Sequence, residues 1–275
     1  MHEVERHRII LSEVGEKPVV TLNYLVDLLG ASEATVRRDI NVLHKQGKLK
    51  KVRGGAESLH PPTSPSLAGR PFSVNQTINA KAKRAIARLA ATLCREGDSI
   101  IINGGTTTFF MAEHLKNSHL HVLTNSFVIA EYLLKNSKCG VTLPGGTVYR
   151  EQNIILSPFP RDVSSQFYAS LLFIGAQGVG QLGVMETDPQ IVQAETKLLE
   201  QAEQRVLLVD SSKFGNRSSL IVCPLNKIDI VITDDGIDQK SRKMIEDAGC
   251  KLMIATLDPS SSTAQAELTE ANDPV

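Results

Sequence analysis

The residues best suited to contact a charged macromolecule lie between Ser32 and Asn41. Ser32 is a good helix N-cap, because its hydroxyl can accept hydrogen bonds from the free amides of a first helical turn. Apolar residues then recur at helical spacing and predict one buried face; they are Val36, Ile40 and Leu43. The residues off that face have side chains that can reach the phosphates and base edges of DNA, and they are Thr35, Arg37, Arg38 and Asn41.

The preceding segment can position this helix. Thr21 can cap a shorter helix, and Gly30 suits the left-handed end of that helix. Its inward residues would be Leu22, Leu25, Val26 and Leu29. Two short helices around a glycine turn, with the second one basic, indicate a helix-turn-helix, preceded here by a helix over 6–15. Taken alone, the basic helix fits an ordinary solvated surface helix equally well.

The segment after the basic helix favours DNA binding. Leu49 to Ala56 alternates apolar and basic residues and turns on two glycines, as a β-wing would. Residues 32–55 hold seven Lys and Arg against two acidic residues, a net charge of +5, in a chain whose formal net charge is zero. Residues 1–31 hold three basic and five acidic residues, a net charge of −2. Positive charge therefore gathers on the predicted DNA-facing elements, including Lys50, Lys51 and Arg53.

Two parts of this segment form a recognisable pattern, namely Arg6, Ile10 and Val14 in the first helix and Ser32-x-x-Thr35-Val36-Arg37-Arg38-Asp39-Ile40 in the third. The pattern resembles the N-terminal signature of the DeoR family of bacterial sugar-metabolism regulators. The resemblance implies a winged helix-turn-helix that binds double-stranded operator DNA.

Composition places the chain among soluble globular proteins, with 275 residues, 41% hydrophobic and 22% charged. Pro and Ser dominate residues 60–71, where we place the domain boundary. The predicted parts are a DNA-binding domain over 1–59, a linker over 60–74, an α/β domain over 75–257 and a disordered acidic tail over 258–275. There is no apolar run that could span a bilayer and no signal peptide, so we expect a cytoplasmic protein.

Cysteine and histidine spacing gives no reason to expect a metal or a cofactor. Cys94, Cys139, Cys223 and Cys250 are scattered, without a C-x-x-C pair, and fit a reducing compartment. The closely spaced histidines fit no zinc pattern and are expected on the surface; they are His114, His119 and His121.

From about Ile78, strand and helix patterns alternate, which predicts a parallel or mixed α/β sheet. The first helix of this part runs from Ile78 to Leu93. The predicted strands are 99–102, 121–124, 140–143, 171–174, 205–209, 228–233 and 251–254. The predicted helices between them are 108–116, 126–136, 190–202 and 239–248.

The run from Asn103 to Thr108 follows a predicted buried strand and opens a helix. Its members Gly104, Gly105, Thr106, Thr107 and Thr108 would bring amides and hydroxyls together beyond a strand end, where open α/β sheets bind ligands. The run is neither a Walker loop nor G-x-G-x-x-G, and alone it fits strand-to-helix packing at least as well. Small or polar residues recur at other strand ends, which favours a phosphate site; these are 124–126, 144–146, 175–178 and 210–213. Among them, Lys213 could supply a cation to a phosphate and Asp210 an acceptor for a sugar hydroxyl.

Residues from about Ala80 to Ala255 also resemble the DeoR-family sensor domain, which has the fold of ribose-5-phosphate isomerase and the CoA transferases. The resemblance implies that Gly104–Thr108 holds the phosphate of a sugar phosphate. It further implies a pocket formed by Asn125, Gly145, Gly146, Gly175, Glu195, Lys197, Asp210 and Lys213, although a solvated helix face explains Glu195 and Lys197 equally well. Residues 150–158 and 186–188 look most like the ascorbate-utilisation repressors of the family, which makes a phosphorylated sugar acid such as ascorbate 6-phosphate a candidate ligand.

Two functions fit these features, a ligand-controlled repressor of a carbohydrate-utilisation operon and an aldose–ketose isomerase with a DNA-binding appendage. Isomerisation needs a carboxylate base within reach of the substrate, and isomerases of this fold carry aspartates on both sides of a Gly-Ala pair. Here Ile174 and Gln177 flank Gly175-Ala176, so we favour binding without chemistry. The family default is repression relieved by the ligand. Because paired DNA-binding domains read repeated half-sites, we expect a homodimer or homotetramer.

Overall fold

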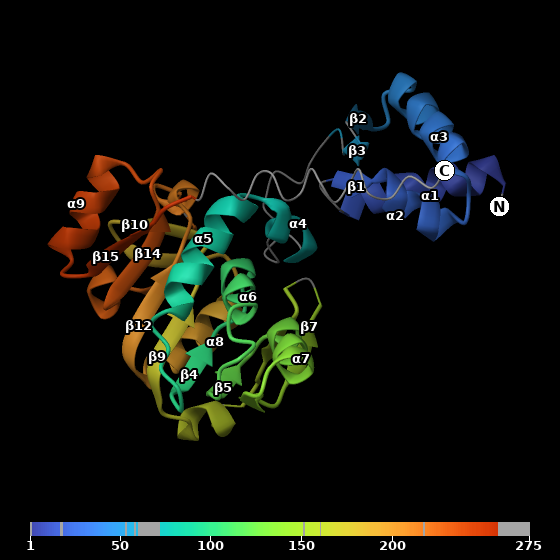
Figure 1. The fold of residues 1–275 in the computed structure, drawn as a ribbon. Coiled ribbons are helices and arrows are strands. Elements are labelled where there is room, and N and C mark those ends of the chain that lie inside the picture. Colours follow the sequence, from blue (N-terminus) through green and yellow to red (C-terminus); the bar gives the residue numbers. More distant parts are fainter. Residues whose placement is uncertain are drawn as a thin grey trace, which may run out of the picture. The chain divides into compact units, whose positions relative to one another are not determined.

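Figure 1 shows the fold in a computed structural model, which describes residues 2–16, 19–52, 54–57, 59, 72–150, 152–159, 161–216 and 218–257. The chain divides into two compact units, Met1–Ser66 and Leu67–Val275. The predicted linker lies mostly outside the described residues, and the predicted acidic tail lies entirely outside them. None of the helices described is both long enough and apolar enough to cross a membrane.

Three helices form most of the first unit, α1 (Glu3–Glu16), α2 (Leu22–Leu29) and α3 (Glu33–Lys45). The predicted caps are confirmed, since Thr21 Oγ1 accepts from the Tyr24 amide and Ser32 Oγ from the Thr35 amide, both at 3.3 Å. Gly30 ends α2 with φ 56°, a left-handed conformation that a residue without Cβ adopts without strain. The predicted helix-turn-helix is therefore present.

One apolar core holds these helices together. Its fully or nearly fully buried members come from all three helices and from the strand region that follows, and include Ile10, Val14, Leu25, Leu29, Val36, Ile40, Leu43 and Leu49. Burying each such side chain contributes about 1.5–3 kcal/mol. The apolar pattern therefore determines which face of α3 remains exposed.

The wing contains one more strand than predicted. Strands β2 (Lys50–Val52) and β3 (Gly55–Glu57) pair antiparallel, and β3 also pairs with β1 (Val19–Thr21), a segment predicted only as an extended approach to α2. A Cβ at Gly55 would lie 2.0 Å from the Val20 carbonyl oxygen, so this close pairing requires glycine. Gly54 supplies the left-handed turn with φ 84°.

A seven-stranded, all-parallel sheet forms the centre of the second unit, as the alternating pattern predicts. In spatial order its strands are β15 (Lys251–Ala255), β14 (Ile230–Asp234), β12 (Ala202–Leu208), β9 (Ala169–Ile174), β4 (Ser99–Ile102), β5 (His121–Thr124) and β6 (Gly140–Thr142). Parallel strands of this kind are covered on both faces, which explains their continuous apolar runs.

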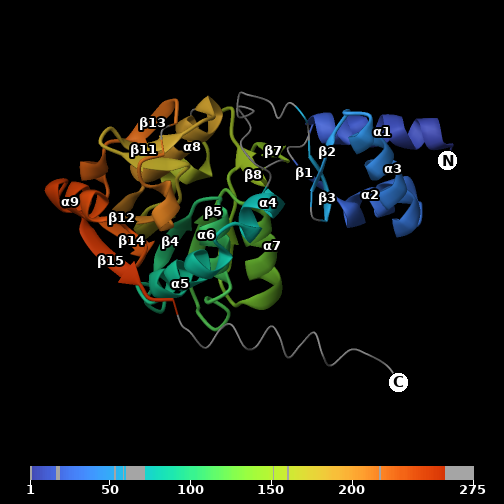
Figure 2. The ribbon, with the colours of Figure 1, turned by 90° about the horizontal axis from the view of Figure 1, so that it is seen from above.

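Helices cover both faces of this sheet (Figure 2). One face packs against α5 (Ala80–Ala91), α6 (Thr106–Ala112) and α7 (Phe127–Asn136) through Ile100, Phe173 and their neighbours. The other packs against α8 (Pro189–Leu199), α9 (Gln239–Asp247) and a small antiparallel sheet through Ile101 and Leu172. Successive strand residues thus alternate between two cores.

Several short elements were not predicted from the sequence. They are the small sheet β10 (Gly178–Gly180), β11 (Gly183–Glu186) and β13 (Leu220–Cys223), the hairpin β7 (Thr147–Tyr149) and β8 (Ile154–Leu156), the helix α4 (Phe72–Thr77) and the 3₁₀ turns η1 (Val163–Gln166), η2 (Ser211–Lys213) and η3 (Leu225–Lys227). Elements of three or four residues are too short to show a period. Helix α4 begins inside the predicted linker because Phe72 is buried and packs edge-on against Phe109, with ring centroids 5.6 Å apart.

Candidate DNA-binding surface and effector pocket

Helix α3 exposes the basic residues that the sequence singled out. Arg37 and Arg38 are both exposed, whereas Val36 and Ile40 face the core. Arg37 Nε donates to Glu33 Oε1 at 2.7 Å, one turn earlier on the same helix. Within the described part of the chain, Arg38 has no hydrogen-bond or ion-pair partner, so its guanidinium is available to an external acceptor.

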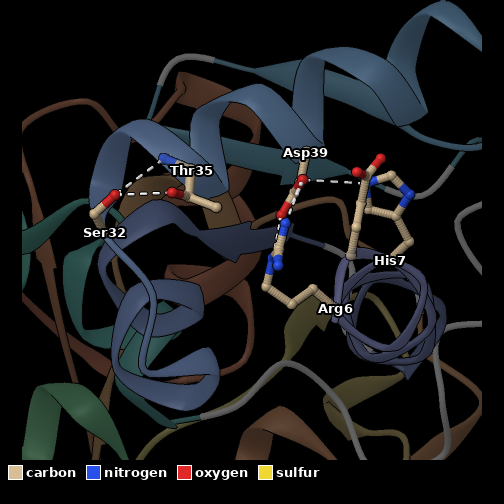
Figure 3. A network of polar contacts seen from close by, with 6 residues as sticks. Arg6, His7, Ser32, Thr35 and Asp39 are labelled. Atoms are coloured by element: carbon tan, nitrogen blue, oxygen red, sulfur yellow. Dashed lines mark hydrogen bonds and ion pairs between the residues drawn. The ribbon is translucent and has the colours of Figure 1, made fainter. Parts of the chain in front are cut away.

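The orientation of α3 is fixed by a buried carboxylate (Figure 3). Asp39 is buried on the inner side of α3, and its Oδ2 accepts from Arg6 Nε at 2.7 Å. Its Oδ1 accepts from Arg6 Nη2 at 3.2 Å and lies 3.2 Å from His7 Nε2. The hydrogen bond to Asp39 raises the pKa of Arg6. This contact ties α1 to α3. Arg6 and Asp39 both belong to the sequence pattern named above, but their pairing was not predicted, although Asp39 falls on the apolar face, where an acid needs a partner.

The wing is linked to the same helix. Lys51 Nζ donates to Asn41 Oδ1 at 2.7 Å, which joins β2 to the exposed side of α3. Lys50 is exposed and lies 3.3 Å from Glu57 on β3. Arg53 lies outside the described residues. The remaining predicted members, Ser32 and Thr35, join hydroxyl to hydroxyl at 2.9 Å at the start of α3. The surface therefore offers cations and amide and hydroxyl groups together, the combination that DNA backbones and bases accept.

A pocket in the second unit opens beyond the carboxyl ends of β4, β9 and β12. It has a volume of about 770 Å³ when its mouth is included. The described residues that line it are Phe72, Asn75, Lys83, Asn103, Gly104, Gly105, Thr106, Thr107, Thr108, Gln152, Ile154, Gly175, Ala176, Gln177, Glu186, Ile191, Glu195, Leu208, Val209, Asp210 and Lys213. Nine of the thirteen residues predicted for a ligand site are among them.

The glycine-threonine run is built tightly into one wall. A Cβ at Gly104 would lie 2.3 Å from Ile154 Cγ2, so Gly104 is required by packing. Gly105 is extended, with φ 168°, and a Cβ there would meet only Thr108 Oγ1, at 3.1 Å. The Thr108 hydroxyl donates to the Gly105 carbonyl, and Thr106 is the most accessible of the three threonines. Helix α6 begins at Thr106 and ends at Ala112, whereas 108–116 was predicted, because α6 starts directly at this turn.

The acidic residues of the pocket are held by neighbours. Asp210 is buried and accepts from Asn79 Nδ2 at 2.9 Å and from the amide and hydroxyl of Ser212. Glu195 Oε1 accepts from Asn103 Nδ2 at 2.6 Å. Burial raises the pKa of Glu195 well above its usual range, and the negative charge of Glu186 raises it further. Glu186 was not predicted as a site residue, because the strand that ends with it, β11, was not predicted either and no local signal placed it at a strand end.

Four predicted residues do not line this pocket. Asn125 lies behind its wall, where Asn125 Oδ1 accepts from the Gly104 amide at 2.7 Å. Lys197 donates instead to Asp162 Oδ2 at 3.0 Å and to the Phe159 carbonyl, because residues two apart on α8 point to opposite sides. The other two are the exposed Gly145 and Gly146, next to the β7–β8 hairpin.

Gly146 has a packing role in that hairpin. Its φ is 156°, and a Cβ there would lie 2.3 Å from the Leu156 carbonyl oxygen. Asn125 and Lys197 share a second, smaller depression with Asp162. Burial opposes ionisation of Asp162, but hydrogen bonds from Ser164, Ser157 and Lys197 outweigh it and lower its pKa to about 2. No three His, Cys, Asp or Glu side chains among the described residues gather in a way that could hold a metal ion.

Comparisons with known proteins agree with both parts of this architecture. Residues 6–61 match the DeoR-like helix-turn-helix domain and residues 78–235 match the DeoR C terminal sensor domain. The transcriptional regulators UlaR of Escherichia coli O127:H6 and of Shigella dysenteriae serotype 1 are 34% and 33% identical over 253 residues, 92% of this chain and 99% of each relative.

Solved structures share parts of the fold at low identity. Ribose 5-phosphate isomerase A of Methanocaldococcus jannaschii is 18% identical, with a TM-score of 0.37 over 50% of this chain and 55% of that one. The translation initiation factor eIF-2B of Pyrococcus horikoshii is 16% identical, with a TM-score of 0.35 over 78% of this chain and 67% of that one.

These matches settle the class of the protein. The predicted order of domains is confirmed, a winged helix-turn-helix followed by an α/β sensor domain. The relatives are regulators of transcription, so the pocket belongs to a regulator and not to an enzyme. The chain is a DNA-binding transcriptional regulator of carbohydrate metabolism and belongs to the DeoR family.

Proposed function

We propose that this regulator represses a carbohydrate-utilisation operon and releases its operator when a phosphorylated sugar or sugar acid occupies the pocket of the second unit. The observation that supports this most directly is the pocket itself, which has an amide- and hydroxyl-lined wall and two lysines and lies in the same chain as a helix-turn-helix. The ligand can act only by binding one arrangement of the protein better than another.

On the DNA side, α3 enters the major groove and the wing follows the backbone. Arg37, Arg38 and Asn41 read base edges, and Ser32 and Thr35 at the helix start contact phosphate. Lys50, Lys51 and Arg53 neutralise phosphates on either side. This division is supported by exposure, since both arginines and both lysines are exposed, and by the general placement of helix-turn-helix motifs.

On the ligand side, Gly104–Thr108 and Lys213 hold the phosphate, while Gly175, Glu195 and Asp210 face the sugar. Asn125 supports the wall from behind through the Gly104 amide. The likeness of residues 150–158 and 186–188 to ascorbate-utilisation repressors makes ascorbate 6-phosphate the first ligand to test. The remaining proposed residues, Gly145, Gly146 and Lys197, would have to act from outside the pocket described.

The working form is a homodimer or homotetramer in the cytoplasm. Two DNA-binding units read two half-sites of an operator, so that a ligand-induced change in their spacing weakens both contacts together. The chain is neutral overall, and local positive charge on α3 and the wing supplies the attraction to DNA.

The proposal is tested by measuring ligand and operator binding in the full chain. Thermal-shift screening against phosphorylated sugars and sugar acids identifies the ligand, and the same compound should weaken binding to an operator fragment. A dephosphorylated ligand serves as the matched control and should bind far less well. A chain that binds its operator unchanged in the presence of every stabilising compound would contradict the proposal.

A further inference from the structure

The pocket wall contains a buried polar atom that has no hydrogen-bond partner in the part of the chain that the structure describes. Glu195 is 4% exposed, and its Oε1 accepts from Asn103. Its Oε2 is buried and has no hydrogen-bond partner among the described residues. An unpaired buried carboxylate oxygen is costly, and an apolar side chain or a satisfied amide would fill the same space at less cost. The position of Glu195 in the pocket wall indicates that a ligand supplies the missing partner.

A second carboxylate stands beside it. Glu186, at the end of β11, lines the same pocket and is 6% exposed. Its Oε1 accepts from the amide of Thr187 at 2.8 Å and from its hydroxyl at 3.2 Å. Burial raises the pKa of Glu186 as well as that of Glu195. Two acids that share a buried site do not both ionise readily, so they titrate as a pair.

The charges that face this pair are few. Lys213 favours ionisation of Glu186 and Asp188 opposes it, while Asn103 is the neutral donor to Glu195. The charged residues described along the pocket wall are two lysines, Lys83 and Lys213, against three acids, Glu186, Glu195 and Asp210. A phosphate would be attracted by the two lysines, and a second anionic group on the same ligand would be repelled by the ionised member of the acid pair.

We propose that Glu186 and Glu195 form an acid pair that recognises two adjacent hydroxyl or enol oxygens of the ligand and excludes a free carboxylate. This inference rests on the proposed function and narrows the class of ligand to aldose, ketose or lactone phosphates, as opposed to open-chain acid phosphates. The protonated acid donates to one ligand oxygen, through the Oε2 that now lacks a partner, and the ionised acid accepts from the neighbouring hydroxyl.

Matched pairs of probes test this selectivity in the full chain by calorimetric titration. The pairs are D-erythrose 4-phosphate with 4-phosphoerythronate, D-ribose 5-phosphate with 5-phosphoribonate, and D-glucose 6-phosphate with 6-phosphogluconate, and inorganic phosphate reports the anion site alone. Wild type should prefer the sugar phosphate of at least one pair by about tenfold or more, which corresponds to about 1.4 kcal/mol. Glu186→Gln and Glu195→Gln should each reduce that ratio at least severalfold and keep the size of the side chain. The first removes the charge that repels a carboxylate, and the second removes the acid proton that the pair shares.

Glu200→Gln is the control, because it makes the same change at an exposed residue directly after α8 and should leave the ratio unchanged. Inorganic phosphate should bind wild type and both pocket variants with similar affinity. If the acid phosphate binds wild type as well as its sugar partner does in all three pairs, the acid pair alone is overturned. Binding of inorganic phosphate with no response to any sugar phosphate overturns the acid pair in the same way. Loss of the response to inorganic phosphate and to all six probes overturns the proposed phosphate site together with it.

Discussion

Arg37 and Arg38 are neighbours in sequence, but the structure predicts different responses to their removal. Arg38 has no partner in the described part of the chain, so under the proposed function a contact with DNA would be its only strong interaction. If Arg38 reads a base, Arg38→Ala should cost about 1–3 kcal/mol of specific binding, roughly 5- to 150-fold in affinity. Arg37 must first leave Glu33, and an exposed i,i+4 pair of this kind contributes about 0.3–0.5 kcal/mol. Glu33→Gln removes that competition and should tighten operator binding about twofold.

Fluorescence anisotropy with an operator fragment and a scrambled fragment measures these changes. Arg38→Ala should lower the ratio of specific to non-specific affinity, whereas Lys50→Ala should weaken both fragments about equally and reduce the salt slope by about one. Glu5→Gln on α1 is the matched control, because it removes an exposed acid away from α3. If Arg38→Ala weakens both fragments equally, then Arg38 contacts phosphate and the assignment of base reading to it is wrong.

Three further predictions concern packing and protonation. Asp39→Leu should speed hydrogen exchange across α3 because it removes the buried carboxylate that Arg6 binds, and adding Arg6→Met should restore much of the protection. Equal exchange in the single and double variants would contradict the pairing. Lys213→Ala should weaken a phosphorylated ligand by about 1.5–3 kcal/mol in calorimetry and leave its dephosphorylated form unchanged; equal losses would remove Lys213 from the phosphate. Because the pKa of Glu195 is raised in the folded state, the free energy of unfolding should fall as pH rises above the ordinary glutamate pKa. Glu195→Gln should flatten that decline in denaturation curves recorded from acid to neutral pH. An unchanged slope would show that Glu195 ionises freely.

The parts of the fold that the sequence predicts correctly have a strong local signal. Ser32 and Thr21 cap their helices because the hydroxyl and the free amides are close in sequence. The parallel strands appear as apolar runs because both faces of the sheet are covered. Spacing alone does not reveal which distant elements meet, and so β1 was not recognised as the third strand of the wing.

In the pocket, too, the sequence indicates residues that have a local signal and misses those that depend on contacts between distant elements. Gly104–Thr108 was found because it joins a strand to a helix, a local feature. Glu186 was not, because its role depends on β11 meeting α8, and that is visible only in three dimensions. For Glu195 and Lys197 the sequence leaves open whether they line a pocket or lie on a solvated helix face. The structure places them on opposite sides of α8, since Glu195 faces the pocket and Lys197 binds Asp162.

Control of DNA binding through the pocket is tested most directly by operator affinity with and without ligand in wild type and Gly105→Val. Gly105 is the better position than Gly104, because its extended backbone accepts a side chain and a Cβ there meets only Thr108 Oγ1. The ligand found by thermal-shift screening should weaken operator binding by wild type, while Gly105→Val should bind the operator as tightly as wild type and ignore the ligand. Operator binding by Gly105→Val that weakens with the ligand as much as wild type does would place the controlling site elsewhere.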